Sequence, residues 1–325
     1  MVIVFWCPPL GGGLGGAPCV ILINIMSRRW KIAWLFVLVL IIGNVLVWSA
    51  AAREDRHGVM TVAFLDIGQG DAIFIEAPNG NQVLVDGGPG QAVLRQLGAV
   101  MPWYDRSLDL VLATHPDADH IGGLPEVLRR YTVSNFMEPG VTSDTGVYQE
   151  LERVVGEQVA TKQLTKTLAR RGMRIILTRG NRDQGSRTSR DEVYLDVLFP
   201  DRDPTGWETN TASIVARLVY DQQSFMLTGD SPVAIERYLM TLDGERLHST
   251  VLKNGHHGSR TSSGPDYLAL VNPEYAVISA GKDNRYGHPH AEVIAALEKL
   301  KIKILPTSER GNIKFKTDGQ KLELI

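Results

Sequence analysis

A long apolar run near the N-terminus restricts the fold of this chain more than any other feature. The run Ile32 to Ala52 contains no charged residue, and a helix needs about 20 apolar residues to cross a bilayer. Arg28, Arg29 and Lys31 precede the run, and the positive-inside tendency therefore places the N-terminus in the cytoplasm. We predict a single-pass membrane anchor, with the chain after Arg53 forming an extracytoplasmic domain.

A cleavable signal peptide is the alternative interpretation of this run. Ser49 to Ala52 offers small residues to a signal peptidase, which would release a secreted protein, but the apolar region exceeds the usual length of about 7–15 residues. Residues 1–25 show no domain pattern, and we interpret them as a non-native or disordered extension. Residues 26–57 then hold the cytoplasmic basic residues, the anchor and a linker, and residues 58–325 form the folded domain.

Composition limits the class of this domain. The chain has 325 residues, of which 44% are hydrophobic and 22% charged, which suits a large globular core. Its formal net charge of -2 neither supports nor excludes a polyanionic ligand, because a local basic patch can act alone. Cys7 and Cys19 both precede the predicted domain. Any metal must therefore be held by histidine and carboxylate side chains rather than by thiolates.

Short β-rich runs and helical segments alternate through residues 58–325. The turn signal Asn79-Gly80 separates two such runs and indicates a β-meander. We predict strands over Thr61–Asp66, Ala72–Glu76, Gln82–Asp86, Leu108–Ala113, Arg174–Thr178, Val193–Phe199, Ser213–Val219, Ser224–Leu227, Ser249–Lys253, Tyr275–Ser279 and Ile302–Leu305, and helices over Glu126–Arg130, Val147–Arg171, Val233–Leu242 and Ala291–Leu300. Strands in blocks with helices between them favour a single α/β sandwich.

Potential metal ligands are concentrated just after the apolar run Leu108–Ala113. His115, Asp117, Asp119 and His120 follow it within a short segment. A loop that leaves a buried strand lets such side chains converge on one metal, because it is not bound by the facing rule of a helix. The setting between an apolar strand and a helix favours a metal site over a solvated polar turn.

The remaining ligands are expected at the ends of other strands. Asp230 follows the predicted strand Ser224–Leu227, His256 and His257 follow another, and His288 follows a short loop. Asp230 alone would suit the N-cap of the helix that comes after it. Together with the histidines it can instead complete a metal site.

Several motifs carry a family resemblance. In chain order they are Phe64–Asp71, Val85–Gly88, His115–Gly123, Asn210–Ser213, Gly229-Asp230, Lys253–Ser259 and Asn284–Pro289. Their order and spacing closely resemble those of the extracytoplasmic metallo-β-lactamase domain of the ComEC/Rec2 competence proteins, over about residues 59–325. The resemblance implies a four-layer αββα sandwich with a hydrolytic site for one or two divalent metal ions, and a nuclease role on incoming DNA.

Carried over by position, the resemblance gives each predicted ligand a role. The implied metal ligands are His115 and Asp117 for one ion, Asp119, His120 and His256 for the second, and Asp230 as the bridge; the implied outer shell comprises Asp66, Asp71, Asp86, His257 and Ser259. The wider superfamily has histidine where Asp117 stands, and no histidine lies between His120 and His248. A site this rich in carboxylate shifts preference from Zn²⁺ towards Mn²⁺ or Mg²⁺.

A water molecule activated by the metal is the expected nucleophile. The expected catalytic residues are Asp119, Lys253 and His288, with Lys253 as a candidate phosphate ligand. The segment Lys162–Arg190 holds nine basic residues and one acidic residue, which indicates either a patch for a phosphate backbone or a solvated helix face. The possible nucleic-acid contacts within it are Arg170, Arg171 and Arg174.

Three functions are compatible with these features. The favoured one is a phosphodiesterase or nuclease that acts on DNA at the extracytoplasmic face. The alternatives are a hydrolase of a lactone, thioester or other ester, and a non-catalytic binding domain of a DNA-uptake system. The full ligand set argues against the last, and the basic segment favours the first. Competence proteins of this family carry a polytopic channel domain, so a role in DNA uptake implies a separate channel protein as partner.

Overall fold

The computed structural model divides the chain into two compact units, Met1–Asp55 and Arg56–Ile325. The described residues are 2–6, 18–22, 28–54, 56, 58–178 and 192–325. Much of the predicted N-terminal extension, residues 7–17 and 23–25, lies outside the described residues, as does the predicted polar loop Arg179–Arg190 with its share of the basic segment.

The first unit contains a short antiparallel pair of strands and one long helix. The strands are β1 (Val2–Trp6) and β2 (Pro18–Leu22), and the helix is α1 (Arg28–Glu54). Within α1 the stretch Arg29–Trp48 has a mean hydropathy of 2.2 and no buried side chain. Among the described residues, α1 is the one helix long and apolar enough to cross a bilayer. It is therefore a candidate membrane span, as the apolar run predicted.

Two β-sheets form the centre of the second unit. The first has the strand order β17-β16-β3-β4-β5-β6-β7-β8, and the second has the order β15-β14-β13-β12-β11-β10-β9. The first comprises β3 (Met60–Phe64), β4 (Ile73–Glu76), β5 (Gln82–Val85), β6 (Ser107–Leu112), β7 (Thr132–Glu138), β8 (Thr165–Leu168), β16 (Ile313–Thr317) and β17 (Leu322–Leu324). The second comprises β9 (Arg174–Thr178), β10 (Val193–Phe199), β11 (Val215–Tyr220), β12 (Gln223–Leu227), β13 (Val251–Lys253), β14 (Tyr275–Ile278) and β15 (Lys303–Pro306).

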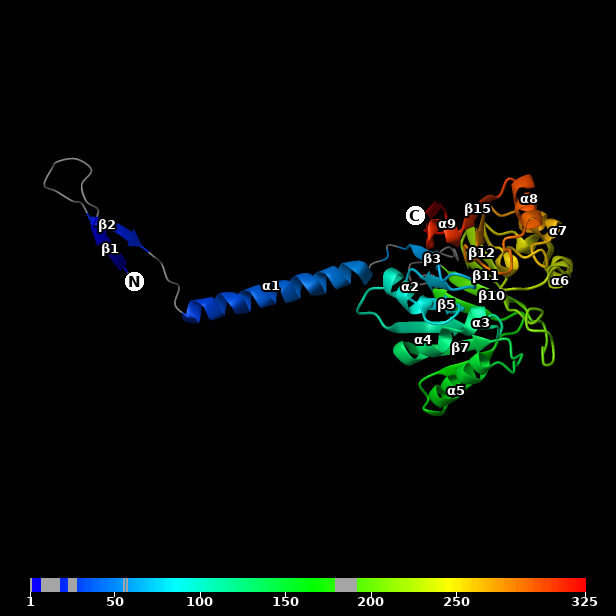
Figure 1. The fold of residues 1–325 in the computed structure, drawn as a ribbon, viewed down its shortest axis with the longest axis horizontal. Helices are drawn as coiled ribbons and strands as arrows, with labels where there is room; N and C mark the ends of the chain where they lie inside the picture. Colours follow the sequence, from blue (N-terminus) through cyan, green and yellow to red (C-terminus); the bar gives the residue numbers. More distant parts are fainter. Residues whose placement is uncertain (1, 7–17, 23–27, 55, 57, 179–191) are drawn as a thin grey trace, which may run out of the picture. The chain divides into compact units, whose positions relative to one another are not determined.

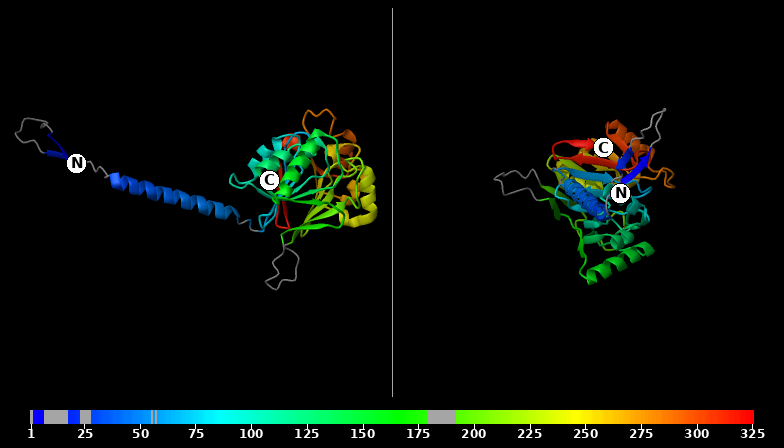
Figure 2. Two further views of the ribbon diagram at one scale, coloured as in Figure 1. Left: turned by 90° about the horizontal axis from the view of Figure 1, so that it is seen from below. Right: turned by 90° about the vertical axis from the view of Figure 1, so that its left-hand side faces the viewer.

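Helices cover the outer face of each sheet (Figures 1 and 2). On the first sheet lie α2 (Ala92–Val100), α4 (Leu124–Arg130) and α5 (Gly146–Ala160), and on the second lie α6 (Val233–Asp243), α7 (Pro265–Val271) and α8 (Ala291–Lys299). The shorter helices are α3 (Ala118–Ile121) and α9 (Thr307–Arg310). The predicted four-layer αββα sandwich is confirmed.

Alternating burial along the strands explains these layers. In β10 buried and half-buried residues alternate along the whole strand, because successive side chains point to opposite faces of a sheet. Apolar side chains fill the space between the two sheets. There the ring centroid of Phe315 lies 6.2 Å from that of Phe64 and 5.9 Å from that of Phe225. Two further apolar clusters lie beneath the two helical layers.

The predicted helix Val147–Arg171 is wrong in its second half. The helix α5 ends at Ala160, and the chain then forms β8 beside β7. Lys162 has a left-handed backbone (φ 56°), which does not continue an α-helix. Lys166 on β8 then pairs with Glu138 on β7, with 2.8 Å between their charged atoms. This long-range pair is not visible in the local pattern of charges.

Parallel strands bring the predicted ligands to one edge of the sandwich. In the first sheet β5, β6, β7 and β8 run parallel, and in the second β12, β13, β14 and β15 do so. Asp86 follows β5 and His115 comes after β6, whereas Asp230 comes after β12 and His256 after β13. The carboxyl ends of parallel strands commonly carry the sites of α/β proteins.

Candidate metal centre

The segment His115–His120 leaves β6 and forms the one-turn helix α3. Asp117 stands at the N-cap position of this helix, and Asp119 follows in its first turn. The segment is fixed from behind by Asp86, whose carboxylate accepts hydrogen bonds from the amide and the hydroxyl of Thr114, each 2.7 Å long. Asp86 is 1% exposed, so this support is protected from water.

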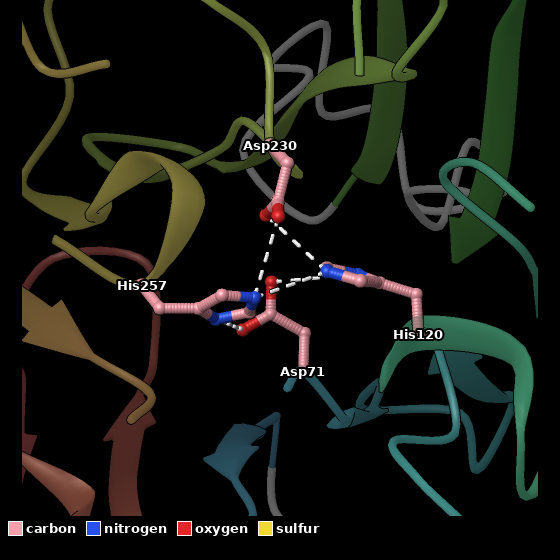
Figure 3. Close-up of side chains that lie close together, drawn as sticks. All are labelled: Asp71, His120, Asp230 and His257. Atoms are coloured by element: carbon pink, nitrogen blue, oxygen red, sulfur yellow. Dashed lines mark hydrogen bonds and ion pairs between the residues drawn. The ribbon is translucent and has the colours of Figure 1, made fainter. Parts of the chain in front are cut away.

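His120 of this segment meets three buried side chains from other parts of the chain (Figure 3). We call Asp71, His120, Asp230 and His257 the inner group; each offers one ligand atom, and these atoms lie within 4.8 Å of one another. Nε2 of His120 is 3.3 Å from Nε2 of His257 and 3.3 Å from Oδ1 of Asp230. None of the four residues is more than 3% exposed.

Both inner imidazoles are oriented through their Nδ1 atoms. Nδ1 of His120 is 2.8 Å from Oδ2 of Asp86, and Nδ1 of His257 is 2.9 Å from the carbonyl oxygen of Ser279. Because a carbonyl oxygen only accepts, Nδ1 of His257 carries a proton and its Nε2 is left to bind a cation. Metal-binding histidines are commonly fixed by such partners.

The site has unsatisfied atoms that fit divalent cations. Oδ1 of Asp71, Oδ1 of Asp230 and Nε2 of His115 are buried without a well-formed hydrogen bond among the described residues, although the His120 ring lies 3.3 Å from Oδ1 of Asp230. Buried polar atoms rarely lack partners in native proteins, so each needs an explanation. Divalent cations bound to oxygen and imidazole nitrogen at this site account for all three, and this donor set suits Zn²⁺ or Mn²⁺.

Four further side chains surround the inner group. We call His115, Asp117, Asp119 and His256 the outer group. Nε2 of His115 is 3.7 Å from Oδ2 of Asp117 and 4.0 Å from Oδ2 of Asp230, and Nε2 of His256 is 3.5 Å from the same Asp230 oxygen. Oδ2 of Asp119 is 3.4 Å from Nε2 of His257. The structure therefore brings all six sequence-predicted metal ligands together around Asp230.

Two inner residues, Asp71 and His257, were expected only as supporting residues. His256 and His257 both have left-handed backbones, with φ values of 46° and 55°. This turn directs His257 into the buried group, while the side chain of His256 remains 26% exposed. In an adjacent pair of histidines, the sequence alone does not distinguish which ring points inward.

Gly70 allows Asp71 to approach the α3 turn. The amide of Asp71 donates a 3.2 Å hydrogen bond to the carbonyl oxygen of Asp119. Gly70 has a φ of +116°, and a Cβ atom on it would lie 2.0 Å from that same oxygen. Glycine is therefore required at this position for both its backbone conformation and its lack of a side chain.

The sequence matches the metallo-beta-lactamase superfamily over residues 65–282. This range contains the inner and outer groups. The chain belongs to the metallo-beta-lactamase superfamily. It is 28% identical to ComE operon protein 3 of Bacillus subtilis, 28% to competence protein ComA of Neisseria gonorrhoeae and 27% to recombination protein 2 of Haemophilus influenzae.

These matches confirm the predicted resemblance to competence proteins. They cover 78%, 85% and 80% of this chain but 33%, 35% and 29% of the three relatives, in the same order. The chain thus spans about a third of the length of each relative. The similarity concerns the metallo-beta-lactamase domain and leaves most of each relative unmatched.

Opposing charges set the protonation of this metallo-beta-lactamase site. Burial acts to lower the pKa of His120 and of His257. The Asp230 carboxylate opposes this at both rings, helped by Asp86 at His120 and by Asp71 at His257, so that both pKa values lie well above the usual range. Burial likewise acts to raise the pKa of Asp230, but the two imidazoles lower it overall. Protons thus balance the carboxylates when no metal is bound, and metal binding must release them.

Lys253 lies behind the inner group and is 1% exposed. Its ammonium contacts the Asp71 carboxylate, lies 3.6 Å from Oδ1 of Asp230 and donates a 3.1 Å hydrogen bond to the Gly229 carbonyl. Burial acts to lower the pKa of Lys253, but the two carboxylates raise it overall. This fixed internal charge faces carboxylates and not solvent, which leaves it poorly placed for the predicted phosphate contact.

His288 lies at the outer side of the site. Its ring centroid is 5.6 Å from that of His256, and its backbone is held by Asn284 through bonds of 2.6 and 2.9 Å. Burial first, and then the neighbouring histidines, lower its pKa to about 4. His288 is therefore neutral at pH 7 and holds a proton only weakly.

Ser259 and Asp66 have structural contacts. The Ser259 hydroxyl is 3.0 Å from that of Thr261, which in turn lies 3.2 Å from Nδ1 of His256. Asp66 belongs to a turn, where its carboxylate accepts a hydrogen bond from the Gly68 amide. Ser259 thus helps to orient an outer ligand, whereas the hydrogen bonds described for Asp66 do not reach the inner group.

The three arginines predicted to contact nucleic acid are engaged within the domain. Arg171 donates to Asp243 at 2.8 and 2.6 Å, and Arg174 donates to Asp196 at 2.6 and 2.8 Å. Arg170 donates to the carbonyl oxygens of Pro139 and Ala169, each at 2.6 Å. Their donors are therefore largely used, which favours a structural role for this part of the basic segment.

Proposed function

We propose that this protein is a metal-dependent phosphodiesterase that cleaves DNA at the extracytoplasmic face of the membrane. The convergence of the inner group carries the proposal, because its buried carboxylate and imidazole atoms fit a divalent cation. The similarity to competence and recombination proteins supports DNA as the substrate. A separate channel protein would then be the partner through which DNA passes.

The ligand assignment follows the two groups of side chains. We assign one ion to the inner group with Asp119 as a further ligand, and a second, weaker position to His115, Asp117 and His256 on the other side of Asp230. Four of the eight donors are carboxylates, and Asp117 stands where the wider superfamily has histidine, so we expect Mn²⁺ to be the more active ion. When bound, the metal lowers the pKa of a water molecule and neutralises charge that develops on the phosphate.

The chain's own residues supply orientation. Asp86 and the Ser279 carbonyl hold the two inner imidazoles, and Lys253 holds Asp71 against the group. His288 contacts the His256 ring and is neutral at pH 7, but its pKa of about 4 and its buried Nδ1 make it a weak base, so we assign it a substrate-positioning role. Asp119, with a side chain that is 32% exposed, is the carboxylate placed to orient an attacking water molecule.

The membrane orientation rests on the charges that flank α1. Arg28, Arg29 and Lys31 precede the apolar stretch, so the domain after it is expected outside the cell. Added protease should then digest this domain in intact cells. Protection that persists until the cells are lysed would contradict the orientation, and release of the domain into the medium would support cleavage of the anchor.

The catalytic proposal is tested with the detergent-solubilised full chain loaded with Mn²⁺ or Zn²⁺. We expect cleavage of single-stranded DNA and of bis-p-nitrophenyl phosphate, faster with Mn²⁺, and none in an Asp230→Asn variant. A simple lactone serves as the competing substrate. Hydrolysis of the lactone without cleavage of either phosphodiester would overturn the proposal, and full activity on DNA with Zn²⁺ would overturn the choice of metal.

A further inference from the structure

An aromatic pocket lies close to the metal centre but outside it. It has a volume of about 310 Å³ and is lined by Phe199, Arg202, Trp207, Glu208, Thr211, Ile235 and Tyr238. These residues come from the end of β10, the loop that follows it and the exposed side of α6. None of them belongs to the inner or outer group.

Three connections tie this pocket to the metal centre. The Thr209 side chain, in the pocket loop, forms a hydrogen bond with Asp117 of the outer group. The hydroxyl of Ser213, two residues after Thr211, accepts a 3.3 Å hydrogen bond from the Asp230 amide. The helix α6 begins three residues after Asp230 and carries Ile235 and Tyr238. At about 1.5 Å per residue, Tyr238 is roughly 8 Å along α6 from its start.

The pocket presents ring faces and a guanidinium. The indole of Trp207 stacks on the buried ring of Phe199, with 5.8 Å between centroids and 29° between planes. Tyr238 meets Phe199 edge-on at 6.4 Å, and its ring is partly exposed. The guanidinium of Arg202 is 5.3 Å from the Trp207 centroid on a side chain that is 72% exposed. Planar bases stack on such aromatic and guanidinium surfaces.

The acidic residues of the pocket loop are held locally. The Glu208 carboxylate accepts hydrogen bonds from the amide and hydroxyl of Thr211, at 2.7 and 2.8 Å. The Asp201 carboxylate accepts the Tyr238 hydroxyl at 2.5 Å. Besides its place over the Trp207 ring, Arg202 has a long 3.9 Å contact with Asp201, so its exposed guanidinium can move to meet a ligand at little cost.

We propose that this pocket binds a nucleobase adjacent to the phosphodiester that lies at the metal centre. The proposal rests on the proposed nuclease function and names the part of the substrate that gives affinity. The pocket, and not the predicted arginine contacts, would then be the main source of affinity for DNA, because the guanidiniums of Arg171 and Arg174 are already paired with carboxylates. Stacking tolerates any base, so the pocket adds affinity without demanding a sequence.

The test is a double-mutant cycle between Trp207 and the base, using the detergent-solubilised full chain. The variants are Trp207→Ala, Trp207→Phe and the matched control Trp103→Ala, which alters an indole that is 77% exposed and lies outside the pocket. The ligands are a single-stranded oligonucleotide and the same oligonucleotide with abasic positions. Kd is measured by fluorescence anisotropy without metal, and KM and kcat are measured with Mn²⁺.

Trp207→Ala should raise Kd and KM about 5- to 150-fold on the normal oligonucleotide, with kcat little changed. On the abasic oligonucleotide it should match the wild type, and Trp207→Phe should retain most of the affinity. A loss that persists in full on the abasic strand, or an equal loss in Trp103→Ala, would overturn the pocket. Binding with the expected coupling but no cleavage would overturn the nuclease function alone, whereas cleavage without coupling would overturn the pocket alone.

Discussion

The inner and outer groups of the metal centre differ in how firmly the protein holds them. Every inner residue is at most 3% exposed and has a partner outside the group or a charged neighbour behind it. In the outer group only His115 is fully buried; the side chains of Asp117, Asp119 and His256 are 38%, 32% and 26% exposed. The inner position is thus formed before any ligand arrives, while the outer position is open to water and substrate.

The difference has a simple electrostatic origin. Buried carboxylates are costly unless compensated, and Lys253 supplies a compensating charge to Asp71 and Asp230. The carboxylates of Asp117 and Asp119 reach solvent and need no such partner. We therefore expect changes behind the inner group to have the larger effects on stability and metal affinity.

The largest effect is expected for Lys253→Met. This change removes the internal ammonium and leaves two buried carboxylates without their fixed cation, so the metal-free chain should lose about 3–5 kcal/mol of unfolding free energy. Urea unfolding in the presence of a chelator measures the loss. Added Mn²⁺ should restore part of it, because a bound cation also neutralises Asp71 and Asp230.

The control for this change is Lys303→Met, at a lysine whose side chain is 61% exposed and pairs with Glu274 at 2.9 Å. Exposed pairs contribute little, so its effect should stay below about 1 kcal/mol. Similar small losses of unfolding free energy in the two variants would mean that protonation of Asp71 or Asp230 compensates for the missing ammonium. The charge of Lys253 would then not be what stabilises the inner group.

A pH-dependent effect of intermediate size is expected at Glu236, which supports the outer side of the centre. This residue is 1% exposed, and its carboxylate accepts hydrogen bonds from the amides of Ser263 and Gly264 at 2.5 and 2.8 Å. These amides belong to the loop that also carries Thr261, the partner of His256. Burial raises the pKa of Glu236 to about 7 despite the two amide bonds.

The direction of the pH effect follows from this shift. The carboxyl group takes up a proton more readily in the folded chain than in the unfolded chain, so its contribution is complete below pH 4.5 and is lost as the pH rises through 7. Relative to Glu236→Gln, the wild type should lose about 3 kcal/mol between pH 4.5 and pH 8. Urea unfolding of both proteins across this range measures the difference. A difference that does not change with pH would show that Glu236 remains ionised throughout.

Much of the fold could be predicted because its strands carry local signals. The predicted strands Arg174–Thr178 and Val193–Phe199 agree with β9 and β10 at both ends. By contrast β7 was not predicted, because Thr132–Glu138 mixes exposed polar and buried apolar residues without strict alternation. Its place between two parallel strands is decided by pairing with β6 and β8, which no local window contains.

The site shows the same limit. Asp117 and Asp230 could be proposed as ligands because each lies a few residues after the end of an apolar strand, and strand ends converge at the sheet edge. The engagement of Arg174 could not be predicted, because its partner Asp196 lies on the neighbouring strand. The role of Lys253 depends in the same way on Asp71, which comes from the opposite sheet and makes a buried cation stable there.

The smallest expected effect, and the most direct test of the comparison, comes from the adjacent histidines. Nε2 of His257 and Nε2 of His256 lie 3.3 and 3.5 Å from the same oxygen, Oδ2 of Asp230, so distance alone does not rank them. The anchoring of the two rings ranks them as ligands. The buried Ser279 carbonyl fixes His257, whereas His256 is contacted by the Thr261 hydroxyl on a more open turn. Loss of the anchored ligand should remove the pre-formed position.

Competition titrations with a chromophoric chelator measure the consequence for Mn²⁺ and Zn²⁺. We expect His257→Ala to weaken binding of the first ion by more than about 100-fold, beyond the usual cost of losing a supporting residue, and His256→Ala by about 10-fold. The exposed His248, which has no contact with either group, provides the control. Equal losses at His256 and His257 would mean that the first ion binds between the groups at Asp230. A larger loss at His256 would reverse the comparison, because the open side would then hold the tighter position.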